Sequence, residues 1–228
     1  MDDLTLSHGP AIVLAPHPDD ESLGCGALLS AIWSGGGRAH VVCLTDGAAS
    51  HPGSRTHPPD RMRLVRRAEL LRAVGILGGR GADVTFLDLP DAAAHRAAGP
   101  GMDAARALGD LADRIGAATL LAPSPLDPHC DHEAGALAAM RVARARTGLR
   151  LMFYPVWSRW VAGGTAPAPD GSAQFAFSGP TRRKRAAIDA HESQSGGVVR
   201  DDPDGFTMPP GFAALFADAP EVFFEPAP

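Results

Sequence analysis

Short apolar runs alternate with helical patterns through the first two-thirds of the sequence, and this alternation limits the fold more than any other feature. The run Ala11–Ala15 is apolar throughout, which is typical of a strand that is buried on both faces. Strands of this kind that are separated by helices predict βαβ units and a mostly parallel sheet covered by helices. We therefore expect an α/β fold, Rossmann-like with three αβα layers, and an active site at the carboxyl ends of the strands.

The hydrophobic pattern also gives expected positions for the elements. Strands are expected at residues 11–15, 39–44, 84–87, 119–122, 151–154 and 174–177. Helices are expected at residues 21–34, 61–77, 104–115, 131–146 and 181–191, with Thr181 as the N-cap of the last helix. In the second helix one face is expected to be buried, and it carries Leu64, Ala68, Leu71 and Val74. No repeat or domain boundary is visible, so the chain is predicted to form one domain over residues 1–228.

The composition gives no reason to expect a nucleic-acid or membrane partner. The net charge of −5 provides no basic surface for nucleic acid. No apolar stretch approaches the roughly 18 residues of a transmembrane helix. Residues 1–4 are acidic and lack the layout of a signal peptide, so a cytoplasmic location is expected. The three widely spaced cysteines predict no disulfide. The oligomeric state is open, because the apolar residues between 212 and 224 fit either the core or an interface.

Directly after the first expected strand, the sequence Pro-His-Pro-Asp-Asp-Glu occupies residues 16–21. His17 and Asp20 are three residues apart, so a single helical turn can direct both side chains to one point. Histidine nitrogen and carboxylate oxygen are zinc ligands, and Asp19 can point beside the metal without binding it. The alternative is that Asp19, Asp20 and Glu21 complement the positive end of the helix dipole. This motif alone supports both interpretations equally.

A second polar cluster follows the fourth expected strand, at residues 127–133. His129 and His132 are again three residues apart and can face one cavity. Asp131 could instead be the N-cap of the following helix. A His-x-x-His pair alone is weak evidence for a metal. Two clusters at separate strand ends that together offer His, Asp and His fit a three-ligand catalytic zinc site with a fourth position for water.

The two clusters resemble those of the PIG-L/LmbE-like zinc-dependent N-deacetylases, in which Pro-His-Pro-Asp-Asp-Glu is followed by Asp-x-His-x-Asp-His. The resemblance extends to residues 44–47, 67–75 and 184–194, so it covers most of the chain. Cys130 departs from the pattern, since the family usually has proline at that position. A thiolate there could compete for zinc.

The resemblance implies a reaction and the residues that perform it. It implies that Zn²⁺ is bound by His17, Asp20 and His132. Fe²⁺ could bind to the same three ligands. Water activated by the metal would then remove the N-acetyl group from an N-acetylglucosamine-type amino sugar or related glycoconjugate, with Asp19 as the general base. His129, held by Asp131 and kept cationic by it, is expected to stabilise or protonate the tetrahedral oxyanion.

Four residues are expected to contact this small-molecule substrate: Asp46, Arg55, Trp157 and His191. Asp46 and Arg55 belong to the polar loop after the second strand, which is either a sugar-binding loop or an ordinary surface loop. The indole of Trp157 can stack on a sugar ring or pack in the core. His191 matches the family form His-x-Ser-Gln, and its alternative is the capped end of a helix.

Other functions remain open at this point. One is an amidase that acts on a larger N-acylated conjugate, such as an antibiotic or a thiol conjugate, and another is a non-catalytic sugar-binding relative. A nucleotide-binding site is disfavoured. The glycines of Gly24-Cys25-Gly26 come about nine residues after Ala15, too late for the tight turn that follows a strand in such sites, and position 29 is leucine.

Overall fold

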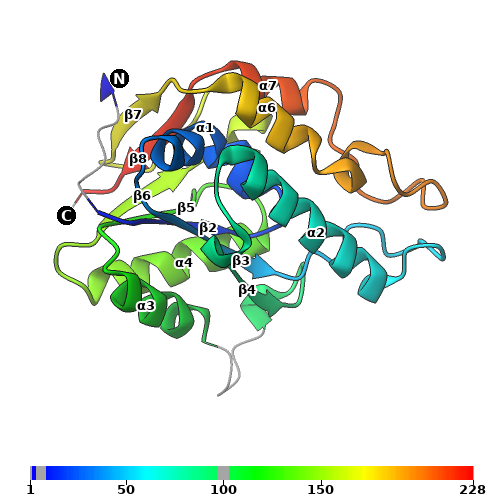
Figure 1. Ribbon diagram of the computed structural model, residues 1–228, viewed down its shortest axis with the longest axis horizontal. Helices are drawn as coiled ribbons and strands as arrows, with labels where there is room; N and C mark the ends of the chain where they lie inside the picture. Colours follow the sequence, from blue (N-terminus) through cyan, green and yellow to red (C-terminus); the bar gives the residue numbers. More distant parts are fainter. Residues whose placement is uncertain (1, 4–8, 97–102, 228) are drawn as a thin grey trace.

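In the computed structural model, which describes residues 2–3, 9–96 and 103–227, one eight-stranded sheet runs through the molecule. Helices cover both of its faces, which gives the three layers that the sequence predicts (Figure 1). The strand order is β1-β7-β8-β6-β5-β2-β3-β4. No helix among the described residues is long and apolar enough to cross a membrane.

Five neighbouring strands of the sheet are parallel, as expected from βαβ units. They are β2 (Ala11–Ala15), β3 (Ala39–Thr45), β4 (Val84–Leu89), β5 (Thr119–Pro123) and β6 (Arg150–Tyr154). Each begins within one residue of its predicted start, so these predictions are confirmed.

The other edge of the sheet is mixed. β8 (Glu221–Glu225) pairs antiparallel with both β6 and β7 (Ala173–Phe177), and β1 (Asp2–Asp3) pairs parallel with β7. The sequence does not predict β8, because its apolar residues are adjacent instead of alternating. Phe223 and Phe224 are fully buried and pack into the cores on opposite faces of the sheet. The C-terminal apolar residues therefore close the core.

The long helices divide between the two faces (Figure 1). On one face lie α1 (Asp20–Ser34), α2 (Pro59–Leu77), α6 (Thr181–Asp189) and α7 (Phe212–Asp218). On the other lie α3 (Ala104–Ile115) and α4 (Cys130–Arg144). The short helices are α5 (Trp157–Val161), η1 (Gly81–Asp83), η2 (Ala94–Arg96) and η3 (Glu192–Ser195). Thr181 is the first residue of α6 and Pro180 is its N-cap, so the predicted cap is wrong by one residue.

The buried face of α2 differs from the predicted one. Leu64 is 66% exposed and Leu71 is 38% exposed. Val74 is buried as predicted, and the other buried residues of α2 are Met62, Arg66, Glu69, Leu70, Ala73 and Leu77. Two of these are charged, and their burial depends on partners from other parts of the chain. Arg66 contacts Asp19, and Glu69 accepts two hydrogen bonds from η3. Hydrophobic periodicity alone does not identify such a face.

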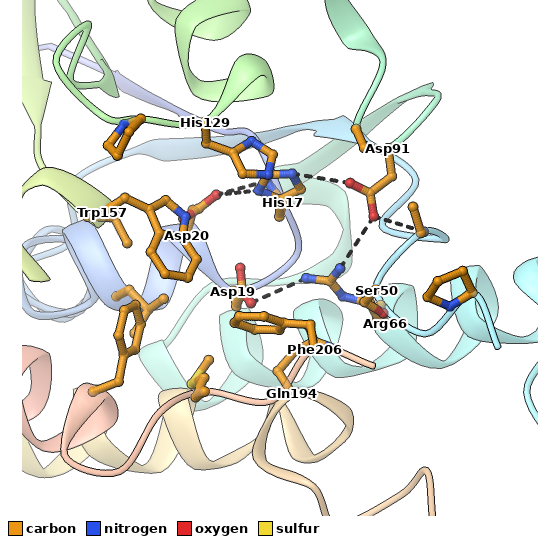
Figure 2. Close-up of a pocket in the computed structure, with 18 of the residues that line it drawn as sticks. His17, Asp19, Asp20, Ser50, Arg66, Asp91, His129, Trp157, Gln194 and Phe206 are labelled. Carbon is orange, nitrogen blue, oxygen red and sulfur yellow. Dashed lines mark hydrogen bonds and ion pairs between the residues drawn. The ribbon is translucent and has the colours of Figure 1, made fainter. Parts of the chain in front are cut away.

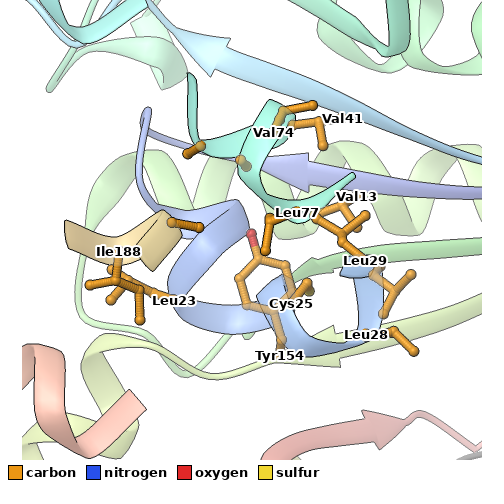
Figure 3. Close-up of a cluster of buried hydrophobic side chains, with 14 of the residues drawn as sticks. Val13, Leu23, Cys25, Leu28, Leu29, Val41, Val74, Leu77, Tyr154 and Ile188 are labelled. Atoms are coloured by element: carbon orange, nitrogen blue, oxygen red, sulfur yellow. The ribbon is translucent and has the colours of Figure 1, made fainter. Parts of the chain in front are cut away.

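The helix α1 packs closely against β6 because it has a glycine at the point of contact. A Cβ atom at Gly24 would lie 2.2 Å from the ring of Tyr154. Tyr154 is fully buried, and its hydroxyl donates a hydrogen bond to the carbonyl oxygen of Leu14 at 2.7 Å, so the ring is fixed. Figure 3 shows the ring against α1, beside Cys25. Gly24 therefore serves helix packing, which explains it without any nucleotide.

Gly24→Ala is expected to lower the free energy of unfolding by about 1–3 kcal/mol, the usual effect of overpacking a core. Gly75→Ala in α2 is the matched control, because nothing lies within 4 Å of its Cβ position. That change is expected to raise the free energy of unfolding by about 0.4–1 kcal/mol, since alanine restricts the unfolded chain. Denaturant titration measures both values. Stabilisation of the protein by both substitutions would contradict the packing role of Gly24.

Candidate active site

A cavity of about 570 Å³ opens beyond the carboxyl ends of the parallel strands, where ligands of such sheets bind. Its walls come from the loops after β2 to β6 and from the C-terminal third of the chain. Figure 2 shows the polar side chains that surround His17 in this cavity. The charged and histidine residues of the lining are His17, Asp19, Asp20, Arg66, Asp91, His129 and Asp204.

Asp20 lies between two imidazole rings. Its Oδ2 is 3.3 Å from Nδ1 of His17 and 3.3 Å from Nε2 of His132. The same oxygen accepts the backbone N–H of His17 at 2.9 Å, which fixes the carboxylate. Strands β2 and β5 are neighbours in the sheet, so the loops that carry the two histidines start side by side. The structure therefore brings together all three residues that are predicted to bind the metal.

Each imidazole has a carboxylate on its other nitrogen. Nε2 of His17 is 3.2 Å from Oδ2 of Asp131 and 3.3 Å from Oδ1 of Asp91. Nδ1 of His132 is 2.9 Å from Oδ2 of Asp127. Metal-binding histidines typically donate their second N–H to a carboxylate in this way, and the contact fixes the orientation of the ring. The nitrogens that remain face the shared carboxylate oxygen.

One buried nitrogen of this group lacks a hydrogen bond. Nε2 of His132 makes no hydrogen bond to any residue in the described part of the chain, although Oδ2 of Asp20 lies 3.3 Å away. Buried polar atoms without a partner are unusual. A buried imidazole nitrogen that makes no hydrogen bond, next to a carboxylate oxygen and a second imidazole, matches the donor set of a catalytic zinc site. The residues fit a metal ion held by His17, Asp20 and His132.

A second set of ligands shares two of these residues. Nitrogen atoms of His17, His129 and His132 lie within 4.8 Å of one another. However, His129 is the N-cap of α4, and its Nδ1 accepts the backbone N–H of Asp131 at 3.2 Å. The proton of the neutral ring is then on Nε2, which leaves neither nitrogen with a free lone pair for a metal. This hydrogen bond favours Asp20 over His129 as the third ligand.

The structure corrects the expected relation between His129 and Asp131. The carboxylate of Asp131 is turned toward His17 and toward two backbone N–H groups of the loop after β4. Burial lowers the pKa of His129, and the positive charges of His17 and His132 lower it further. His129 is therefore neutral at pH 7. It offers an N–H donor in place of the expected cation.

Asp19 is held in the cavity by a buried arginine, Arg66. Nη2 of Arg66 is 3.2 Å from Oδ2 of Asp19, and the guanidinium also donates to the backbone carbonyls of Pro18 and Gly47. Burial raises the pKa of Asp19 to about 6, although Arg66 opposes the rise. A carboxylate of this kind can accept a proton near neutral pH. Arg66 is not among the residues predicted for the site. The signal that could have identified it is its helical spacing from Met62, Leu70 and the other buried residues of α2.

Asp91, which follows β4, is a second residue of the site that is not predicted from the sequence. Its Oδ1 faces His17, and its Oδ2 is 3.8 Å from Nη1 of Arg66. Burial acts to raise the pKa of Asp91, but His17 and Arg66 lower it well below its usual range, so the carboxylate is charged. A polar residue at the carboxyl end of a parallel strand is the signal that could have identified it.

Of the four residues predicted to bind substrate, Trp157 lines the cavity and the other three lie outside its lining. His191 is fully buried, with Nε2 3.0 Å from Oε1 of Glu21. The Asp46 carboxylate accepts two backbone N–H groups within the loops. Arg55 is exposed, on a loop whose backbone is bonded to the C-terminal segment. The side chains of His191 and Asp46 thus hold the core and the loops together, and Arg55 is anchored through its backbone N–H.

The apolar wall of the cavity comes from a segment whose path the sequence does not predict. Phe206, Met208 and Phe212 line it together with Trp157, and the rings of Phe206 and Trp157 meet edge to face with their centroids 5.9 Å apart. Asp201 holds this segment in place, because its carboxylate accepts four hydrogen bonds from residues 54–56. Such bonds between two distant loops leave no local signal in the sequence.

Known proteins resemble this chain both in fold and in sequence. Solved structures share the fold. A triple mutant of a deacetylase (Orf2*T) of the teicoplanin biosynthetic pathway has a TM-score of 0.70 at 21% identity, covering 95% of this chain and 97% of that one. The zinc-inhibited form of teicoplanin deacetylase Orf2 has a TM-score of 0.67 at 18% identity, covering 94% and 97%. The N,N′-diacetylchitobiose deacetylase from Pyrococcus horikoshii, in complex with an inhibitor, has a TM-score of 0.66 at 18% identity, covering 82% and 70%.

At these identities the structural similarity establishes the fold alone. No match was found among curated proteins. A sequence profile of the family described as GlcNAc-PI de-N-acetylase (PIG-L) matches residues 12–143, which is more than half of the 228 residues. The matched segment includes both histidine clusters and Arg66. This chain belongs to the PIG-L family.

Proposed function

We propose that this protein is a metal-dependent N-deacetylase that removes the acetyl group of an N-acetylglucosamine-type amino sugar or related glycoconjugate. The observation that carries the proposal is the oxygen of Asp20 between two carboxylate-bound imidazoles, with Asp19 buried beside it. This arrangement offers a metal site and a separate base, the two components that amide hydrolysis needs. Membership of the PIG-L family supports the same reaction.

The metal would be held by His17, Asp20 and His132. Nitrogen and oxygen donors in this number fit Zn²⁺, and Fe²⁺ uses the same ligands. When bound, the ion supplies positive charge that polarises the amide carbonyl and lowers the pKa of water. A teicoplanin deacetylase of the same fold is described as having a zinc-inhibited form, so the metal is best titrated and not added in excess.

The chain's own residues move and stabilise charge. Asp19 takes the proton of the attacking water and returns it to the leaving amine, and its pKa of about 6 suits both transfers. Arg66 keeps the Asp19 carboxylate in place through their contact of 3.2 Å. Nε2–H of His129 donates to the carbonyl oxygen of the substrate, where negative charge develops during attack.

The two sides of the cavity suggest a two-part substrate. Arg66, Asp91 and Ser50 lie on one side in Figure 2, and Trp157 lies on the other. Sugar hydroxyls can bind the polar side, while the aromatic side can hold an apolar aglycone. The same aromatic side favours the second candidate, an amidase that acts on a larger N-acylated conjugate.

Two further expectations rest on the sequence alone. They are that the chain forms a single domain and that it functions in the cytoplasm.

The direct test is release of free amine from a panel of N-acetylated substrates. The panel contains N-acetylglucosamine, its chitobiose dimer, a glucosaminyl-malate type conjugate and a nucleotide-linked sugar. Each is assayed with the metal-free protein and with one equivalent of Zn²⁺ or Fe²⁺. Metal-dependent release from any member supports the proposal. The proposal would be contradicted if the protein binds one metal ion per chain but releases amine from none of these substrates.

Asp19→Asn is expected to lower kcat by about 10²–10⁴, because the variant keeps the shape of the site but loses its base. The metal content should be unchanged, since Asp19 is not among the proposed ligands. Asp60→Asn is the matched control, because that carboxylate is 90% exposed at the start of α2. Initial rates and metal analysis measure both effects. Full activity in Asp19→Asn would exclude it as the base.

Metal binding is expected to release protons. Burial lowers the pKa of His132, but Asp20 and Asp127 raise it to about 9. Burial also acts to lower the pKa of His17, and hydrogen bonds to carboxylates raise it well above its ordinary value. Both rings are therefore protonated at pH 7 in the metal-free protein, and a metal requires them neutral. Binding should release about two protons and tighten as the pH rises toward 9.

Calorimetric titration in two buffers of different ionisation enthalpy measures this release. The observed enthalpies should differ in proportion to the number of protons taken up by the buffer. Equal enthalpies in the two buffers would mean that the imidazoles are already neutral, contrary to this prediction.

Phe206→Ala is expected to raise KM for an aryl glycoside of N-acetylglucosamine about tenfold, since it removes about 1.4 kcal/mol of apolar contact. The KM for free N-acetylglucosamine should change by less than about twofold, because this substrate has no aglycone and so makes no such contact with Phe206. Phe175→Ala in β7 is the control, as this ring lies outside the cavity lining. An equal rise for both substrates would contradict an aglycone role for Phe206.

A further inference from the structure

We infer that His95, Cys130 and Asp131 form a second metal site for Zn²⁺, next to the proposed catalytic site but separate from its cavity. His95 belongs to η2, and the other two residues begin α4. None of the three appears in the lining of the cavity among the described residues. Cys130 also has no part in the proposed reaction.

The distances between the donor atoms suit a zinc ion. One ligand atom from each residue lies within 4.8 Å of the other two. Sγ of Cys130 is 3.7 Å from Oδ1 of Asp131. Tetrahedral zinc with Zn–S of about 2.3 Å and Zn–O of about 2.1 Å places sulfur and oxygen about 3.6 Å apart. The pair is thus already at the spacing that the ion requires.

The donor types favour zinc over the harder cations. Thiolate, imidazole and carboxylate are all zinc ligands, and the thiolate disfavours Mg²⁺ and Ca²⁺. Binding converts the Cys130 thiol to a thiolate, and its proton passes to the solvent. Three protein ligands leave a fourth position for water.

The cluster is open to solvent on the side away from the buried aspartate. His95 is exposed, Cys130 is half-buried and Asp131 is fully buried. An ion can therefore arrive at the imidazole and the thiol and then reach the carboxylate, without passing through the substrate cavity.

The two oxygens of Asp131 connect this cluster to the catalytic site. Its Oδ2 is 3.2 Å from Nε2 of His17, and it also accepts the N–H of Ala92 at 2.8 Å. Its Oδ1 accepts the N–H of Ala94 at 2.9 Å and faces Cys130. A cation bound at Oδ1 reduces the negative charge that the carboxylate presents to His17. Since that carboxylate orients His17, an ion in the second site weakens the first.

The second site therefore inhibits the enzyme when it is occupied. This consequence for activity depends on the proposed function, whereas binding at the second site does not. The experiment keeps the two apart by measuring binding with a spectroscopic probe and inhibition with the amine-release assay.

The binding test uses Co²⁺ as the probe metal with the full-length protein. The wild type should take up a second equivalent of Co²⁺ and develop a thiolate-to-cobalt charge-transfer band in the near ultraviolet. Cys130→Ser should bind the first equivalent and show no such band. His95→Asn should lower the affinity for the second equivalent of Co²⁺ by more than about tenfold. Loss of a ligand lowers metal affinity at least as much as loss of a residue that hydrogen-bonds to a ligand. His40→Asn is the control, since His40 lies in β3 and contacts Thr85.

Absence of the band in the wild type at two equivalents would overturn the second site, and so would a band that persists in Cys130→Ser. For inhibition, wild-type activity should fall as Zn²⁺ rises from one to two equivalents, and in Cys130→Ser this fall should be lost. A band with unchanged activity would overturn the coupling through Asp131. Absence of amine release from every substrate would refute the proposed function, and the cobalt spectrum would still decide the second site.

Discussion

The contact of one carboxylate oxygen with two imidazole nitrogens is the interaction on which the rest of the site depends. Oδ2 of Asp20 is 3.3 Å from both His17 and His132, which come from parts of the chain far apart in sequence. The parallel pairing of β2 with β5 makes this meeting possible, because both loops leave the sheet at the same edge. The close packing of Gly24 on Tyr154 then sets where α1, and with it Asp20, can lie.

Burying this many charged groups is costly unless each has a partner. The carboxylates around the imidazoles meet this condition through backbone donors as well as through the rings. Asp127, for example, accepts the N–H groups of Val156 and Ser158 as well as contacting His132. Without metal, protons on the imidazoles balance the carboxylates. A metal would replace those protons in a site whose geometry already exists, which accounts for the coupling between metal affinity and pH.

The sequence predicts the parts of the molecule that depend on local pattern. The five parallel strands are found within a residue of their predicted starts. His17, Asp20 and His132, the ligands that the family resemblance implies, lie together at the ends of two of these strands. The parts that depend on tertiary contacts are missed. Arg66 looks like a surface residue until Asp19 is placed against it. Phe206 lines the cavity because Asp201 ties its loop to residues 54–56 and its own backbone N–H donates to the carbonyl oxygen of Ser50.

The most direct test of this account is anomalous diffraction at the zinc edge from crystals grown with one equivalent of Zn²⁺. One strong peak is expected, within about 2.0–2.2 Å of Nδ1 of His17, Oδ2 of Asp20 and Nε2 of His132. The ring of His129 should not bind the metal, and its Nδ1 should still accept the backbone N–H of Asp131. A peak bonded to His129 instead of Asp20, or no peak in this cavity, would contradict the account.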